Sequence, residues 1–193
     1  MSRDSNREQD PGDVRVVFRR LTDDDLPLLY RWLNEPGVVR WWEGDDVTWP
    51  AVVRDYGSAS TDAAERWLAL LEGRPIGWIQ CYLAAHYVGE AEPEAWWGLG
   101  VDRTAAGIDY LIGEPTERGK GLGTRMIGGF VQDVVVLRHP DWTQVCASPV
   151  SANVASWRAL EKSGFTFRGE FASEHGRCRL MVLERAAIER RSP

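Results

Sequence analysis

The sequence predicts an α+β fold with one mixed β-sheet of about six to seven strands flanked by about four helices. Apolar alternation predicts strands in both halves of the chain, and apolar residues at helical spacing separate them. Two strand pairs are joined by short turns, as in hairpins, and other strands are joined through helices, so the sheet combines both connections. The expected strands are 14–20, 66–71, 76–82, 107–113, 143–147, 165–171 and 179–183, and the expected helices are 22–33, 49–56, 120–138 and 153–163.

The length of 193 residues is that of one domain with a core of its own. We expect residues 1–13, which are polar and contain Pro11-Gly12, to form a disordered tail. The domain itself should cover residues 14–186, with a second tail at 187–193.

Composition excludes several classes of protein. A hydrophobic content of 44% with 27% charged residues is typical of a globular protein in water. No apolar run approaches membrane-spanning length, and the first ten residues lack a signal-peptide core, so a cytoplasmic location without membrane contact is expected. The cysteines Cys81, Cys146 and Cys178 form no paired motif, and the three histidines show no metal spacing, so we expect neither disulfides nor a metal.

Charge is distributed unevenly along the chain. Residues 1–100 carry 10 Lys and Arg against 18 Asp and Glu, a net charge of −8, whereas residues 101–193 carry 13 against 11, a net charge of +2. The acidic half would suit a cationic substrate and would repel nucleic acid, and the basic half would suit a phosphate-bearing cofactor. A solvated acidic surface explains the asymmetry equally well.

The first helix should begin at Thr22, with Asp23, Asp24 and Asp25 in its first turn, where carboxylates favour the helix dipole. This acidic triplet is therefore interpreted as capping and not as catalytic. The helix should end at 34–37, and the adjacent Trp41 and Trp42 follow, close to Glu43, Asp45 and Asp46. Because neighbouring side chains point in different directions, at least one of these tryptophans is expected to line a cleft.

Residues 87–106, which surround Trp96-Trp97, are polar and contain glycines, so they are expected to form a long loop. Loops of that length inside compact domains are often functional.

Three glycines at alternate positions, Gly119, Gly121 and Gly123, connect the strand at 107–113 to the helix that follows. A helix start has unpaired N–H groups and a partial positive charge, and glycine lets an anion approach the backbone. A phosphate-binding loop of nucleotide triphosphatases needs Ser or Thr after Gly-Lys, but Gly121 follows Lys120. The dinucleotide fingerprint fails as well, because Thr124 stands where its last glycine belongs. An ordinary glycine-rich turn is the structural alternative.

The pattern Arg118-x-x-Gly121-x-Gly123 resembles the acyl-CoA signature of the GNAT acetyltransferases, and the order of elements from Val14 to Arg185 resembles that fold. Ser151-Ala-Asn153 and Leu160-Glu-Lys-Ser-Gly-Phe165 resemble a second motif of the family. The resemblance extends to the aminoglycoside 6′-N-acetyltransferases through several further segments. These segments are Leu29-Tyr-Arg-Trp-Leu-Asn34, Val39-Arg-Trp-Trp42, Glu72-Gly-Arg-Pro-Ile-Gly77, Trp96-Trp97, Gly107-Ile-Asp109 and Gly119-Lys-Gly-Leu-Gly-Thr124.

The resemblance implies a set of site residues. The pyrophosphate of acetyl-CoA would be held by Arg118, Gly119, Lys120, Gly121, Leu122, Gly123 and Thr124. The pantetheine arm would pair with the strand at Ile108, Tyr110 and Leu111 and would contact Asn153. The cationic amine would be bound by Trp41, Trp42, Tyr56, Glu94, Trp96, Asp109 and Ser148.

The implied reaction is direct attack of a primary amine, the 6′-amino group of an aminoglycoside, on the thioester in a ternary complex, which would confer antibiotic resistance. An alkyl ammonium with a pKa near ~10 must first lose a proton, and Asp109 is the expected base, followed by Glu94. A structural hydrogen bond of Asp109 within a buried strand is the alternative to this role.

Two departures from the family stand out. Ser148 stands where the relatives have a carboxylate, and Leu160 stands where a tyrosine usually meets the cofactor sulfur. Water or Tyr110 could protonate the thiolate instead. Another amine acceptor (a lysine-derived siderophore precursor, a lysine or a protein N-terminus) and a non-catalytic acyl-CoA-binding module remain alternatives, and the chain could be a monomer or a homodimer.

Overall fold

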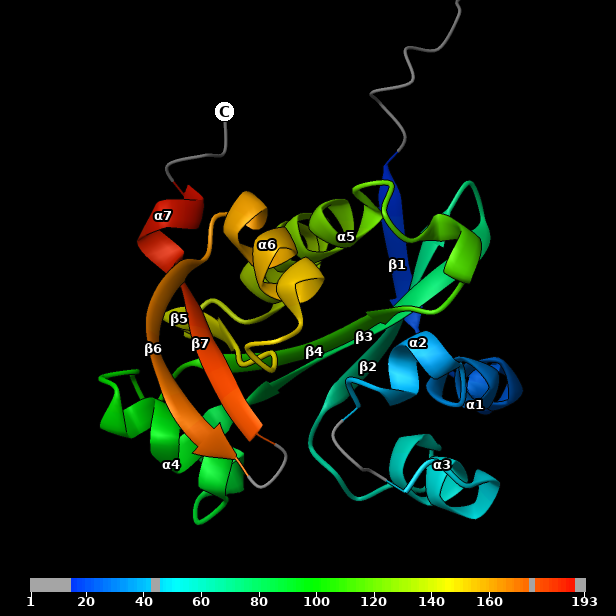
Figure 1. The fold of residues 1–193 in the computed structure, drawn as a ribbon, viewed down its shortest axis with the longest axis horizontal. Helices are drawn as coiled ribbons and strands as arrows, with labels where there is room; N and C mark the ends of the chain where they lie inside the picture. The colour runs from blue at the N-terminus through cyan, green and yellow to red at the C-terminus, as the bar shows by residue number, and fades with distance from the viewer. Residues whose placement is uncertain (1–14, 43–45, 174–175, 190–193) are drawn as a thin grey trace, which may run out of the picture.

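The computed structural model describes residues 15–42, 46–173 and 176–189. Its centre is a seven-stranded sheet in the order β1-β2-β3-β4-β5-β7-β6, in which only β4 and β5 pair in parallel (Figure 1). The mixed sheet that the sequence predicts is therefore confirmed. The strands are β1 (Val16–Arg20), β2 (Glu65–Leu71), β3 (Arg74–Leu83), β4 (Ala106–Ile112), β5 (Gln144–Ala147), β6 (Thr166–Ser173) and β7 (Gly176–Glu184).

The described residues form seven α-helices, more than the four expected. They are α1 (Leu26–Leu33), α2 (Pro36–Val39), α3 (Trp49–Tyr56), α4 (Ala91–Gly98), α5 (Leu122–Phe130), α6 (Val154–Ser163) and α7 (Arg185–Glu189). A π-helical segment, Val131–Val136, continues α5. Short 3-10 turns cover Asp23–Asp25, Ala84–Tyr87 and Pro115–Glu117.

The helices cover both faces of the sheet. In Figure 1, α5 and α6 lie above β4, and α1 to α4 lie below it. Successive strand residues point to opposite faces, and accordingly Ile108 packs with residues of α5 and α6, whereas Leu111 packs with residues of α1 and α3. Strand β4 therefore lies between the two halves of the core.

Strand β4 has a neighbour on both sides only at its beginning. It pairs with β3 along its whole length, from Leu83↔Ala106 to Gly77↔Ile112. Its pairing with β5 consists of two residue pairs, Ala106↔Val145 and Gly107↔Cys146. Within the described residues, β4 therefore has one unpaired edge from residue 108 onwards.

The acidic triplet has the structural role that was expected. Asp25 Oδ2 accepts hydrogen bonds from the amide and the hydroxyl of Thr22 at 3.0 and 2.8 Å. Arg19 pairs with both carboxylate oxygens of Asp25, at 2.6 and 2.7 Å, and lowers the Asp25 pKa to about 2. Asp25 thus ties the start of α1 to β1.

The main correction concerns 87–106, which is a helix and not a loop in its central part. Helix α4 has Glu92 and Glu94 in its first turn, and Trp96, with 1% of its surface exposed, lies in the core. The sequence does not reveal α4 because the helix is short and because glycines lie on both sides of it. Packing of Trp96 against distant residues of β3, β5 and β7 stabilises the helix.

The C-terminal boundary expected at residue 186 falls inside α7, where Ile188 is buried to 2% exposure. The expected tail at 1–13, as well as Glu43, Asp45 and His175, lies outside the described residues.

Candidate active site

A cavity of about 880 Å³ follows the unpaired edge of β4 and is lined from both faces of the sheet. It extends from the start of α5, past β4, to the side chains of α2, α3 and α4. Most of the residues expected at the site border it, and we describe them from the glycine loop onwards.

The start of α5 opens into this cavity through Gly119, Gly121, Gly123 and Thr124. Gly121 is the N-cap residue with φ of 77°, a backbone conformation that favours glycine, and no side chain in the described part of the chain caps the helix there. Gly119 has a similar φ of 75°. The first-turn N–H groups of α5 are therefore available to an anion in the cavity.

Arg118 borders the cavity, but its guanidinium is used within the protein. Its Nε donates to the carbonyl of Ile112 at 3.0 Å, Nη2 donates to that of Gly113 at 3.3 Å, and Nη1 pairs with Glu35. The side chain therefore fastens the glycine loop to β4 and α2. Its contribution to an anion site is to hold the loop in place.

Two loop residues do not border the cavity with their side chains. The Lys120 ammonium pairs with Glu117 at 3.2 Å, and Leu122 is buried against Val16, Ile76 and Met126. Periodicity could not reveal this, because the direction of each side chain depends on how α5 packs on the sheet.

Ile108, Tyr110 and Leu111 border the cavity along the unpaired edge of β4. A strand edge without a partner presents free N–H and C=O groups, which an extended amide chain can pair with. Asn153 caps α6 through a 3.3 Å hydrogen bond from the Ser156 amide and also borders the cavity.

The other end of the cavity carries aromatic and acidic side chains. Trp41, Trp42 and Tyr56 line it, and Trp42 and Tyr56 both pack edge-on against the buried ring of Trp78, at 5.7 and 5.4 Å between centroids. Both of the adjacent tryptophans thus reach the cleft, where at least one was expected.

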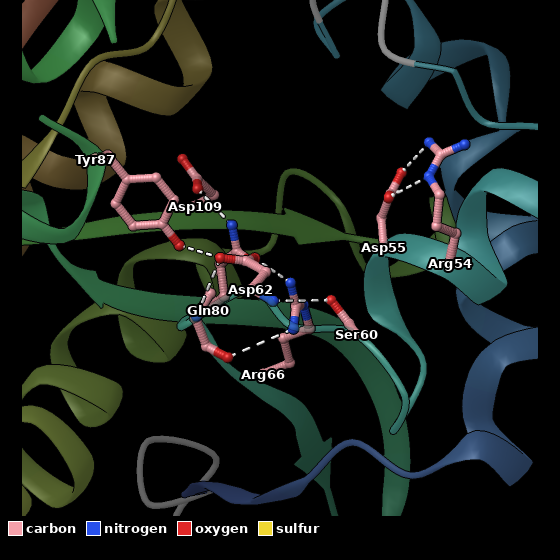
Figure 2. A network of polar contacts seen from close by, with 9 residues as sticks. Arg54, Asp55, Ser60, Asp62, Arg66, Gln80, Tyr87 and Asp109 are labelled. Atoms are coloured by element: carbon pink, nitrogen blue, oxygen red, sulfur yellow. Dashed lines mark hydrogen bonds and ion pairs between the residues drawn. The ribbon is translucent and has the colours of Figure 1, made fainter. Parts of the chain in front are cut away.

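Asp109 points into this end from β4. Gln80, its register partner on β3, donates a 2.7 Å hydrogen bond to Asp109 Oδ2, as Figure 2 shows. In the same view, Asp62 accepts from the Tyr87 hydroxyl and pairs with Arg66. Arg66 offsets the charge of Asp62, and the neutral amide of Gln80 orients the carboxylate of Asp109.

Sequence reasoning missed several cavity residues, namely Asp62, Gln80, Tyr82, Tyr87, Glu90 and Glu92. Gln80 and Tyr82 lie opposite Asp109 and Gly107, so the hairpin register would have indicated them. The Tyr82 ring lies so close to Gly107 that a Cβ there would come within 2.3 Å of it. Burial raises the pKa of Tyr82 well above its usual value.

Glu94 and Trp96 were expected to bind the amine, but neither of them borders the cavity. Glu94 is exposed, accepts from the amide of Gly89 at 3.2 Å and does not border the cavity, whereas Glu92 does. At about 100° per helical residue the two carboxylates point to opposite sides of α4. Trp96 lies beneath the site and donates its indole N–H to the hydroxyl of Ser148, which does border the cavity.

Glu65 of β2, Cys81 of β3 and His139, which follows the π-helical segment, have ligand atoms within 4.8 Å of one another. Arg20 lies 2.9 Å and Arg138 3.6 Å from the Glu65 carboxylate. Burial raises the Cys81 pKa to about 12. Two nearby cations and a protonated thiol both oppose a divalent metal.

None of the helices in the described part of the chain combines the length and apolar character that a membrane crossing requires.

Comparisons with known proteins agree with this geometry. A profile described as "Acetyltransferase (GNAT) domain" matches residues 22–173. Aminoglycoside N(6′)-acetyltransferase type 1 of Klebsiella pneumoniae is 32% identical over 179 residues, which cover 91% of this chain and 86% of the relative. N(6)-hydroxylysine O-acetyltransferase of Escherichia coli is 26% identical over 187 residues, covering 93% of this chain and 55% of that protein.

Among solved structures, AAC(6′)-Ib in complex with paromomycin and acetyl-CoA superimposes with a TM-score of 0.80 at 32% identity, covering 93% of this chain and 98% of that one. The chain therefore belongs to the GNAT acetyltransferases and, within them, to the family of the aminoglycoside N(6′)-acetyltransferases.

Proposed function

We propose that this enzyme transfers the acetyl group of acetyl-CoA to the 6′-amino group of an aminoglycoside by direct attack in a ternary complex, and so confers resistance. The observation that carries the proposal is a single cavity whose two ends differ in charge and meet at β4. At one end the lining cations Arg118, Arg158 and Lys162 outnumber Glu117, and the other end is lined by Asp62, Glu90, Glu92 and Asp109.

The basic end suits coenzyme A. The uncapped first turn of α5 would hold the pyrophosphate through backbone N–H groups, as helix starts do. The unpaired edge of β4 would pair with the pantetheine amides, and Asn153 lies beside it. When bound, acetyl-CoA supplies an acetyl group activated as a thioester.

The acidic end suits a polyamine. Asp109 would dock the reacting ammonium and accept its proton directly or through water, since an ammonium cannot attack until it is deprotonated. Glu92 takes the place expected of Glu94 and would bind another amine, and the faces of Trp41 and Trp42 would cover apolar parts of the rings. Backbone N–H groups of β4 would polarise the thioester carbonyl.

A cytoplasmic location agrees with this function, because acetyl-CoA is made there and the chain keeps its three cysteines as buried free thiols. Binding of a cationic substrate in an acidic cavity requires neither nucleic acid nor a membrane as a further partner.

The test is a thiol-release assay with acetyl-CoA and matched pairs of aminoglycosides that carry either an amino or a hydroxyl group at C6′. We expect turnover with the 6′-amino member only. Equal rates on both members would contradict transfer to the 6′ position.

A lysine-derived acceptor is the second candidate, because the Escherichia coli relative is an O-acetyltransferase of N(6)-hydroxylysine. Including N(6)-hydroxylysine in the panel separates the two. A kcat/KM for it above that of every aminoglycoside would replace the first proposal by the second.

A further inference from the structure

Consecutive residues of β4 point to opposite faces of the sheet next to the same cavity. Asp109 pairs with Gln80 on the face of α1 to α4, whereas Tyr110 packs among residues of α5. Both line the cavity, because β5 has separated from β4 at this level. A group that assists the amine and a group that assists the leaving sulfur can therefore act from opposite sides of one strand.

The Tyr110 hydroxyl meets Ser156, in the first turn of α6. Tyr110 Oη lies 2.8 Å from Ser156 Oγ and 3.5 Å from the carbonyl oxygen of Ser156. Either hydroxyl can be the donor in the 2.8 Å contact, and with Tyr110 as the donor its proton points towards Ser156 Oγ. The Ser156 hydroxyl is then free to donate into the cavity, which both residues line.

Leu160 lies four residues after Ser156, on the same face of α6 and one turn further along. It stands where the family usually has a tyrosine that meets the cofactor sulfur, but its side chain is completely buried in the core and has no proton to donate. Ser156 carries a hydroxyl one turn closer to the start of α6 and lines the cavity.

We propose that Tyr110 and Ser156 replace the missing tyrosine through hydrogen bonds. Ser156 Oγ–H donates a hydrogen bond to the departing sulfur of acetyl-CoA, and Tyr110 Oη–H donates one to Ser156 Oγ. This rests on the acyl transfer proposed above. Ser156 is then a catalytic residue and Tyr110 a positioning residue.

The hydroxyls of Ser156 and Tyr110 donate hydrogen bonds, and neither of them gives up its proton in the reaction. The amine nitrogen bonds to the carbonyl carbon, the C–S bond breaks, and its electron pair stays on sulfur as a thiolate. The acceptor ammonium loses two protons to solvent by way of Asp109, and the thiolate takes one proton from water as it leaves, so one proton is released per turnover. Burial raises the pKa of the Tyr110 hydroxyl, and the hydroxyl therefore remains a donor throughout the working pH range.

The test measures the pKa of the thiol of bound coenzyme A from thiolate absorbance in the ultraviolet, without any acceptor. A hydroxyl that donates to sulfur stabilises the thiolate and lowers this pKa. Relative to the wild type, we expect Ser156→Ala to raise it by about one unit. Tyr110→Phe should raise it by less, and the double variant should match Ser156→Ala, because Tyr110 acts through Ser156. Tyr30→Phe, on the outer side of α1, is the matched control and should change nothing.

Turnover should follow the same order, with kcat about tenfold lower in Ser156→Ala. Equal thiol pKa values in the wild type and both single variants would overturn the proposal, and so would loss of coenzyme A binding in both variants but not in Tyr30→Phe. The titration contains no aminoglycoside, so failure of the proposed acceptor would leave its result intact.

Discussion

Gln80 on β3 and Asp109 on β4 are register partners, and the Gln80 amide donates to the Asp109 carboxylate at 2.7 Å. The neutral amide of Gln80 fixes the direction of the Asp109 carboxylate. Arg66, in contrast, brings a positive charge to the carboxylate of Asp62. The carboxylate of Asp109 is thereby held in the cavity, at the point where β4 and β5 separate.

Asp109→Asn preserves the shape of this side chain and removes the proton acceptor. We expect kcat for a 6′-amino aminoglycoside to fall by roughly 10²-fold or more, measured by thiol release. Asp133→Asn is the control, since Asp133 forms an exposed ion pair with Arg15 outside the cavity. Near-normal turnover of Asp109→Asn would remove Asp109 from the role of base.

Gly121 and Gly128 provide a matched pair of glycines at and within α5. Gly121→Ala forces a Cβ onto a residue with φ of 77°, which should cost about 1 kcal/mol of folding free energy and weaken coenzyme A binding. At Gly128 a Cβ meets nothing within 4 Å, so Gly128→Ala should stabilise the helix by about 0.5–1 kcal/mol. Urea unfolding and calorimetry measure both effects, and unchanged coenzyme affinity in Gly121→Ala would argue against an anion site at this helix start.

The Arg19–Asp25 ion pair makes the folding stability depend on pH. The bonds from Arg19 lower the Asp25 pKa from 3.8 to about 2, so the stabilisation is complete above pH 4 and is lost as the pH falls through 2. Asp25→Asn should cost about 1–2 kcal/mol at pH 7, allowing for the exposure of Arg19, and much less near pH 2. Urea unfolding at both values checks this, and an equal loss at the two would contradict it.

The three cysteines are expected to be unreactive in the native state. Cys81, Cys146 and Cys178 are all buried, and burial raises the pKa of both Cys81 and Cys146. Because the thiolate is the reactive form, a thiol reagent at pH 8 should label none of them within minutes and all three in urea. A thiol that reacts immediately in the folded protein would show that this part of the core opens.

Local patterns in the sequence predicted most of the strands, because alternation and turn residues are properties of neighbours in the chain. The helix 49–56 and the end of α6 at Gly164, whose φ is 100°, agree with prediction for the same reason. The helix α4 was missed because its stability comes from the burial of Trp96 among residues far away in the sequence.

The sequence alone determined where most strands lie along the chain and where α5 starts after its glycines, since both depend on the backbone preferences of a few adjacent residues. Only the tertiary structure decided which polar groups share the cavity. It brings Gln80 to Asp109, Glu92 rather than Glu94 to the rim, and Tyr110 to Ser156. The physical reason is that the direction of a side chain depends on helix rotation and strand register, which are set by packing against residues elsewhere in the chain.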